Sequence, residues 1–491
     1  DKGIIENIHN IFSLSVFSFM YLIENLKEYE SFELYYQQKW EKFDSFDSFI
    51  ELFIKKIFAK KNQGFFNYLK PKKISKLRKI LIKLNNVFCY LLDKKNTKLI
   101  VGSLLTKKIF KEMRSGNTIL QIKPFNDFRI YHIILNLLSV IIFFKKKKIF
   151  YFFPLEESSS NNDLIKNLKN FFSNFQNQNF NYFRSTLLNA LLSYCNDQLK
   201  INGSILKIIN YIKPKYVFVD QLRFNVATVL ASICKTKKID VILIPHGSIS
   251  KPDSKYSEFV LPICARGLIY SKLASYSVAQ SKISYEAIQY YDSNLKILKS
   301  KPLLFGKTNL NKEMNNKNKF TFLHASTPKS LSKWPWIYEN YNEYVQNLTD
   351  LIKFLKKRKN VELIIRFKEG PECDLKTLKK LINLDENSFI KISKNKPFFD
   401  DLEQSNCLVS FSSTTIEETL FLNKLVLIYS RDKNYKHINY QFTNKNDIHY
   451  ANKQNINDEL DKILDKNNLK NYDILWNDDI QNEEDFKKLF L

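Results

Sequence analysis

Glycine and cysteine are scarce in this chain, and the cysteine pattern narrows its setting. The 491 residues include nine glycines and six cysteines. No two cysteines form a C-x-x-C pair, and several lie in apolar runs, so we expect buried free thiols in a reducing, cytoplasmic compartment. Lysine, asparagine, isoleucine, phenylalanine and tyrosine are abundant instead, a skew typical of an AT-rich genome.

Long hydrophobic runs are missing as well. The most apolar stretch is 133–154, and the uncharged run that overlaps it, Ile130 to Phe144, contains a histidine and an asparagine. It is shorter than the ~20 apolar residues that a membrane-spanning helix needs. We therefore predict a helix followed by a buried strand. Lys145 to Lys148, beside aromatic residues, are also compatible with peripheral contact at the inner face of the cytoplasmic membrane.

Positive charge is the third bias. The chain carries 77 lysines and arginines against 50 aspartates and glutamates, a formal net charge of +27. Such an excess favours nucleic acid, anionic lipid or phosphorylated partners. No recognition helix, aromatic RNA-binding signature or zinc-finger spacing accompanies it, so we expect no nucleic-acid partner.

The alternation of apolar runs with helical patterns predicts an α/β fold. Continuous apolar runs separated by helices are what parallel sheets covered on both faces require. The predicted strands are 97–102, 147–154, 216–220, 240–245, 267–271, 319–324, 361–367, 389–393, 407–412 and 425–429.

The length predicts more than one domain, because it exceeds what a single hydrophobic core supports. Residues 1–95 are aromatic-rich and helical in pattern, an N-terminal elaboration. Residues 96–306 and 320–491 then form two doubly wound, Rossmann-like halves, and the polar residues 307–319 form the linker between them.

A histidine and a glycine stand together where one predicted strand ends, in "VILIPHGS". Ligands of such sheets bind beyond the carboxyl ends of the strands. There Gly247 would let the backbone approach a ligand, and His246 could exchange a proton near neutral pH. The alternative is a turn shaped by Pro245 and Gly247, with His246 capping the next helix.

The second candidate stretch is "FSSTTIEETLF". The hydroxyls of Ser412, Ser413, Thr414 and Thr415 at a helix start predict an anion cradle suited to a diphosphate, and Glu418 could accept hydrogen bonds from sugar hydroxyls. An ordinary helix cap followed by acidic residues explains the same pattern.

Two further strand ends of the C-terminal half carry polar residues. His324, Ser326 and Thr327 follow one strand, and Arg366 and Lys368 follow the next. All five could contact phosphate oxygens. A turn histidine and a surface charge are the alternatives for His324 and Arg366.

The order "KPKYVFVD…VILIPHGS…FTFLHASTP…VELIIRF…SSTTIEETLFLNKLVLIY" resembles the GT-B glycosyltransferase superfamily. It is most similar to the bacterial capsule and surface-polysaccharide transferases that include the Kdo transferases and the CDP-glycerol glycerophosphotransferase-like enzymes. The similarity covers about 205 to 430. Asn423 and Leu425 stand where relatives usually have Gly and Pro, and "RFKEG" stands where many have Arg-Pro-His-Pro.

The resemblance implies two Rossmann-like domains facing a cleft and transfer of a sugar from a nucleotide-activated donor to a glycan or lipid-linked acceptor, without a metal or other cofactor. The donor would lie on the C-terminal half. His246 or Asp220 would be the catalytic base, and Arg223 and Ser248 would contact the acceptor. The alternatives are a nucleotide-sugar 2-epimerase of the same fold, disfavoured because "FSSTT" lacks glycine, and a non-catalytic scaffold of glycan assembly.

Overall fold

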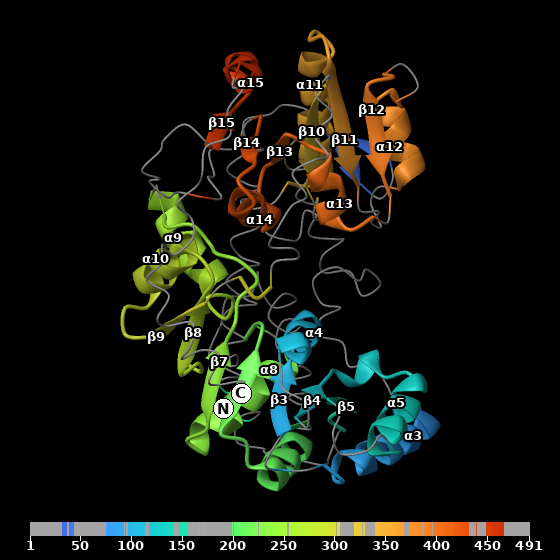
Figure 1. The fold of residues 1–491 in the computed structure, drawn as a ribbon, viewed down its shortest axis with the longest axis vertical. Coiled ribbons are helices and arrows are strands. Elements are labelled where there is room, and N and C mark those ends of the chain that lie inside the picture. The colour runs from blue at the N-terminus through green and yellow to red at the C-terminus, as the bar shows by residue number, and fades with distance from the viewer. Residues whose placement is uncertain are drawn as a thin grey trace.

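The computed structural model describes most of the central part of the chain, namely residues 32–43, 75–155, 199–304, 319–326, 339–367, 374–431 and 448–465, with short gaps and a few isolated positions besides. These residues form two parallel sheets, a two-stranded hairpin and the surrounding helices (Figure 1).

The first sheet has seven parallel strands in the order β5-β4-β3-β6-β7-β8-β9. The chain starts at β3, winds outward to β5, returns to the middle at β6 and winds outward the other way, which is the doubly wound pattern. The strands are β3 (Thr97–Val101), β4 (Thr118–Ile122), β5 (Lys148–Phe152), β6 (Tyr216–Val219), β7 (Asp240–Leu243), β8 (Tyr276–Ala279) and β9 (Lys296–Lys299).

Helices cover both faces of this sheet, which explains the continuous apolar strands. Ile100, Phe218 and Ile242 pack on one face with Leu105 of α4, whereas the alternate strand residues pack with α8 on the other. The helices of this half are α3 (Lys76–Cys89), α4 (Ser103–Glu112), α5 (Tyr131–Ile141), α8 (Asn225–Thr236), α9 (Lys255–Ala265) and α10 (Lys282–Tyr291), together with the helical residues 201–212 and the short η2 (Phe125–Asp127).

The second sheet has six parallel strands in the order β12-β11-β10-β13-β14-β15, the same winding pattern. Its strands are β10 (Phe320–Ala325), β11 (Val361–Arg366), β12 (Ile390–Ser393), β13 (Cys407–Ser410), β14 (Leu425–Tyr429) and β15 (Ile448–Ala451). Its helices are α11 (Tyr341–Leu355), α12 (Leu375–Leu381), α13 (Phe398–Glu403), α14 (Thr415–Phe421) and α15 (Ile456–Leu464). The predicted fold class is confirmed as far as an α/β protein built from two doubly wound, Rossmann-like parallel sheets.

The N-terminal region departs in part from its prediction. Helix α3 is confirmed, but β1 (Phe32–Tyr36) and β2 (Lys39–Phe43) form an antiparallel hairpin where the sequence pattern predicted helix. The stretch 44–74, also part of the region predicted to be helical, lies outside the described residues. The aromatic residues that suggested a helical face also favour strands, so the period was misassigned.

Other elements differ from prediction because their sequences are short or combine apolar and polar residues without a clear pattern. The strand predicted at 267–271 is a turn, in which Gly267 has φ of +73°. Strands β4, β8, β9 and β15 were not predicted. The helix and strand predicted within 133–154 are present as α5 and β5. None of the helices in the described part of the chain combines the length and hydrophobicity that crossing a bilayer requires.

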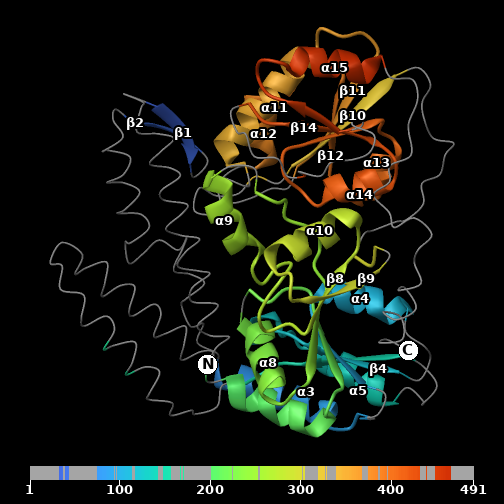
Figure 2. The same cartoon turned by 90° about the vertical axis from the view of Figure 1, so that its left-hand side faces the viewer.

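The two sheets meet around α10. Ile283 of α10 belongs to the same apolar cluster as Ile416 and Leu420 of α14, so the two halves share part of a hydrophobic core. Figures 1 and 2 both show α10 between the sheets. The predicted linker, 307–319, lies outside the described residues apart from its last position.

Candidate active site

Three adjacent strands of the first sheet end side by side. Val219 pairs with Val101 of β3 and with Leu243 of β7, so the segments after the three strands leave the same edge of the sheet. Asp220 follows β6 and its carboxylate lies directly over Gly102. A Cβ added to Gly102 would lie 2.4 Å from the carboxylate, and the φ of Gly102 is +124°. The glycine therefore makes room for the aspartate, a role that the sequence did not reveal.

The same edge brings Asp220 and His246 together. The Nε2 atom of His246 lies 3.6 Å from an Oδ atom of Asp220. The Asp220 side chain is 11% exposed and that of His246 36%, so the carboxylate is largely shielded while the imidazole remains open to solvent. An imidazole that reaches solvent and is positioned by a shielded carboxylate is suited to act as a general base toward a bound ligand.

The next two residues contact the C-terminal half. A Cβ added to Gly247 would lie 2.6 Å from Cγ2 of Thr414 and 3.1 Å from a carboxylate oxygen of Glu417, so the glycine permits close approach of the two halves. The backbone N–H and the hydroxyl of Ser248 both donate hydrogen bonds to Oε1 of Glu417, at 2.7 and 2.8 Å. The loop that carries His246 is therefore joined to the start of α14.

Glu417 is the centre of this joint, although the sequence prediction selected its neighbour Glu418. It is 1% exposed, and its second carboxylate oxygen accepts a hydrogen bond of 3.3 Å from the hydroxyl of Ser281. Burial raises the pKa of Glu417, and the hydrogen bonds from Ser248 and Ser281 oppose part of that rise. Ser281 also caps α10, so one carboxyl group joins the segments that follow β7 and β8.

Gln280 supports the same loop from behind. Its amide N–H₂ donates to the carbonyl of Pro245 at 2.5 Å, and its carbonyl oxygen accepts from the N–H groups of Leu303 and Leu304 at 2.6 and 2.8 Å. The side chain is buried. Gln280 thus fixes the residue before His246 relative to the segment that leads toward the second sheet.

The polar residues predicted in the second half lie in several places. Ser412 is buried, Ser413, Thr414 and Thr415 are half-buried, and Thr415 opens α14. The Ser326 hydroxyl accepts a 3.4 Å hydrogen bond from the N–H of Phe411. Glu418 is half-buried. Thr327 and Lys368 lie outside the described residues. Of this hydroxyl run, Thr414 lies against Gly247 of the loop that carries His246.

Arg366 and His324 contact other parts of the second half of the molecule. The guanidinium of Arg366 forms an ion pair with Asp401 and donates hydrogen bonds to the carbonyls of Lys396 and Pro397, at 3.0 and 3.2 Å, which ties it to the start of α13. His324 is buried against the ring of Tyr344, and burial lowers the pKa of His324 to about 4. The imidazole is therefore neutral near pH 7 and could act there only through hydrogen bonds.

Arg223, predicted to hold an acidic acceptor, is buried in the loop after β6. Its Nε donates to the carbonyl of Arg266 at 3.5 Å. Within the described residues, no group of three histidine, cysteine, aspartate or glutamate side chains is arranged to hold a metal ion.

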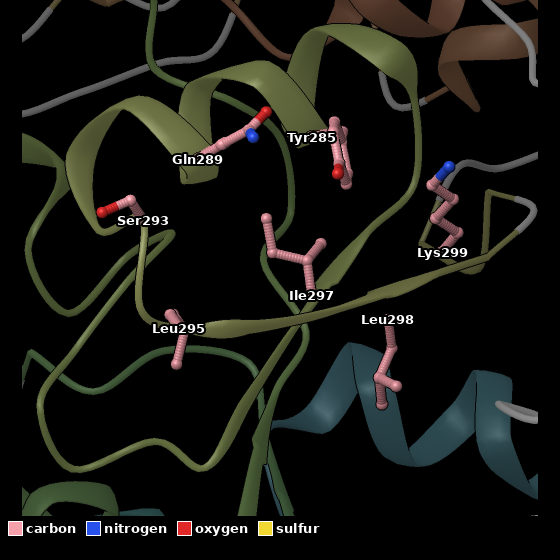
Figure 3. A pocket seen from close by; sticks show the side chains of 7 residues that line it. All are labelled: Tyr285, Gln289, Ser293, Leu295, Ile297, Leu298 and Lys299. Atoms are coloured by element: carbon pink, nitrogen blue, oxygen red, sulfur yellow. The ribbon is translucent and has the colours of Figure 1, made fainter.

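A cavity of about 270 Å³ lies apart from this site, between α10 and the edge strand β9. Figure 3 shows Ile297 pointing toward α10 and Leu298 pointing the other way, toward α4. Its lining also contains Tyr285, Gln289 and Lys299. The lining has no acidic residue to complement the lysine, so we assign no chemistry to it.

Replacing Gly247 with alanine should separate the two halves locally. The new methyl group would overlap Thr414, and overpacking of this kind typically costs about 1–3 kcal/mol of unfolding free energy. The double variant Gly247→Ala, Thr414→Ser lacks the threonine methyl group that the alanine would overlap, so it should recover most of the lost unfolding free energy. Chemical denaturation measures both, and a double variant as unstable as the single one would contradict the contact.

No protein-family model matches the chain, and no curated protein matches it. Similar solved structures include the UDP-GlcNAc 2-epimerase of Neisseria meningitidis bound to UDP-GlcNAc (11% identity, 76% of this chain and 94% of that chain, TM-score 0.43). They also include the UDP-GlcNAc 2-epimerase of Methanocaldococcus jannaschii in complex with UDP-GlcNAc and UDP (16%, 80% and 99%, 0.41) and a glycosyltransferase of Rickettsia africae (15%, 80% and 93%, 0.42). These similarities do not decide between epimerisation and glycosyl transfer.

Proposed function

We propose that the protein is a glycosyltransferase that moves a sugar from a nucleotide-activated donor to a glycan or lipid-linked acceptor in surface-polysaccharide synthesis. The observation that carries the proposal is the pairing of Asp220 with His246 at the carboxyl edge of the first sheet. His246 directly precedes Gly247 and Ser248, which contact α14 of the second sheet and the residue before it. A proton-transfer pair on one half thus adjoins a run of hydroxyl groups on the other.

In this proposal His246 is the base that removes a proton from the acceptor hydroxyl. The imidazole is exposed enough to meet an acceptor, and Asp220, 3.6 Å away, stabilises the imidazolium that forms. Gly102 keeps the carboxylate in place by leaving room for it. The acceptor then approaches from the side of the first sheet.

The donor is proposed to lie over the start of α14. Hydroxyl groups of Ser413, Thr414 and Thr415 and nearby backbone N–H groups supply hydrogen-bond donors for a diphosphate, and Glu418 is the proposed contact for the ribose or sugar. Arg366 is bound to α13, so a phosphate contact would require it to leave Asp401. Ser326 and Thr327 remain proposed donor contacts.

A panel of nucleotides tests the donor site. We expect one of CMP, CDP, UDP, GDP and dTDP, or its sugar conjugate, to raise the apparent stability by about 2.7 kcal/mol at a hundredfold excess over its dissociation constant, measured by thermal shift. Glu418→Ala should abolish the shift, because it removes the proposed ribose contact. His246→Ala should retain it, because that residue serves the acceptor.

Product analysis with the stabilising sugar nucleotide separates the alternatives. Transfer to a glycan or lipid-linked acceptor supports the proposal. Conversion of the free sugar nucleotide to its 2-epimer without an acceptor would identify an epimerase. Absence of any nucleotide-dependent shift at saturating concentrations would favour a scaffold without a donor site.

A further inference from the structure

Helix α3 turns its apolar side outward. Its exposed large side chains, between 50% and 67% exposed, are Leu77, Ile80, Leu84 and Val87, and Leu91 continues the series just beyond the helix. The buried positions are Ile82, Asn85, Asn86 and Cys89. Most of the large apolar side chains of α3 therefore face outward, whereas the apolar stripe of a surface helix usually faces the core.

Helix α5 packs beside α3 and shows the same reversal. Its inward residues include His132 and Asn136, and the Ser139 hydroxyl donates to the carbonyl of Ile149 at 3.1 Å. Large apolar side chains, between 37% and 64% exposed, point outward from this helix and the residue before it, namely Ile130, Tyr131, Ile134, Leu135, Leu137, Leu138 and Val140. Figure 1 shows the two helices together at one end of the molecule.

The inward asparagines fix the rotation of both helices. β5 is the edge strand of its sheet, so alternate backbone groups have no neighbouring strand. Asn136 accepts from the N–H of Tyr151 at 2.8 Å and donates to its carbonyl at 3.0 Å. Asn86 does the same with Phe153, at 3.1 and 2.7 Å. Turning either helix to bury its leucines would leave these buried backbone groups unpaired.

The two helices carry charge of one sign only, although Asp127 and Arg129 are both exposed just before α5. Neither α3 nor α5 contains an acidic residue, and Lys76 and Lys83 are exposed beside the leucines of α3. Soluble monomers rarely expose a contiguous apolar surface of this kind, and such surfaces mark binding sites for proteins or membranes. Exposed lysines that flank an apolar stripe complement an anionic bilayer surface.

We propose that the outward face of α3 and α5 binds the surface of an anionic lipid bilayer, with both helices lying in the plane of the interface. Leucine and isoleucine side chains enter the acyl boundary while Lys76 and Lys83 meet the lipid phosphates. The sequence placed a membrane contact at Lys145 to Lys148, but Lys147 donates to the carbonyls of Phe110 and Lys111 at the end of α4, at 3.1 and 2.8 Å. The apolar helices form the better surface.

Co-sedimentation with lipid vesicles tests the proposal. The full chain should bind vesicles of phosphatidylcholine mixed with phosphatidylglycerol, and bind more weakly to phosphatidylcholine alone. The variant Leu84→Gln, Leu138→Gln should lose at least about tenfold in partitioning. Lys76→Gln, Lys83→Gln should lose about 25-fold on anionic vesicles only, since each of the two cations contributes roughly a fivefold factor.

Two controls keep the result interpretable. Tyr290→Gln removes an exposed aromatic side chain from α10, away from the proposed face, and should bind vesicles like the wild type. Thermal unfolding should be unchanged in each variant, because the replaced side chains are exposed. Equal vesicle binding by the leucine variant and the wild type would overturn the proposal. The proposal would also be overturned if the wild type showed no affinity for vesicles and instead formed a concentration-dependent dimer that the leucine variant no longer formed.

Discussion

Replacing His246 with glutamine is expected to lower turnover by roughly 10²–10⁴-fold, the range lost when a positioned general base is removed, while nucleotide binding persists. Glutamine keeps a hydrogen-bonding group but does not take up a proton near neutral pH. The loss should appear in kcat, measured with the sugar nucleotide that the binding panel identifies.

Asp220→Asn should show a comparable loss, because the amide no longer stabilises the imidazolium 3.6 Å away. Gly102→Ala should also lower kcat without removing any reacting group, since its methyl would displace the Asp220 carboxylate. The matched control is Asp240→Asn, which makes the same change at the first residue of β7, at the opposite end of the strand that leads to His246. Full turnover by His246→Gln would exclude the histidine as the base.

The proximity of Asp220 and His246 could be predicted from the sequence. Each follows an apolar run read as a parallel strand, and consecutive strands of this kind usually lie side by side with their carboxyl ends at one edge. The strand pairing from Tyr216 with Asp240 to Val219 with Leu243 supplies this arrangement. The role of Gly102 was not accessible, because the sequence does not show that β3 lies beside β6.

The choice between Glu417 and Glu418 illustrates a second limit. Ile416 and Leu420 are the buried apolar residues of α14, and Glu417 lies three residues before Leu420 on the same buried side. Helical spacing therefore favoured burial of Glu417. What the carboxylate would contact depended on how the two halves meet, and no local pattern encodes the partners Ser248 and Ser281.

The inverted helices show a third limit. Apolar spacing predicted helices in α3 and α5 correctly, and the usual rule would have turned that spacing toward the core. Here asparagine side chains bind the free edge of β5, which decides the rotation instead. The partner of Arg366 was likewise not predictable from a local pattern, because its ion pair with Asp401 depends on the packing of α13 against the sheet.

Replacing Glu417 should produce the largest change in stability. Glu417→Ala leaves the buried N–H of Ser248 without its acceptor and opens a cavity, at a cost of roughly 2–5 kcal/mol of unfolding free energy. Hydrogen exchange at the amide of Ser248 should accelerate as the loop opens, whereas exchange in the α11 core should change less. Urea denaturation followed by tryptophan fluorescence gives the free energy.

Glu417→Gln separates the hydrogen bonds from the charge. Burial raises the pKa of this carboxyl group above its unfolded value, so its contribution to stability is complete below the unfolded pKa and is lost as the pH rises through the folded pKa. Glutamine keeps an acceptor for Ser248 and carries no titrating proton. The free energy of the variant should therefore gain on the wild type as pH rises through this window, by at most about 1.4 kcal/mol per pH unit.

Glu258→Gln makes the same chemical change on the exposed surface of α9, and its difference from the wild type should stay within about 0.5 kcal/mol at every pH. A Glu417→Gln protein that loses stability relative to the wild type as the pH rises would mean that the anion is favoured at the joint. The hydrogen bonds from Ser248 and Ser281 would then outweigh burial, and the two halves would be held together by a charged carboxylate.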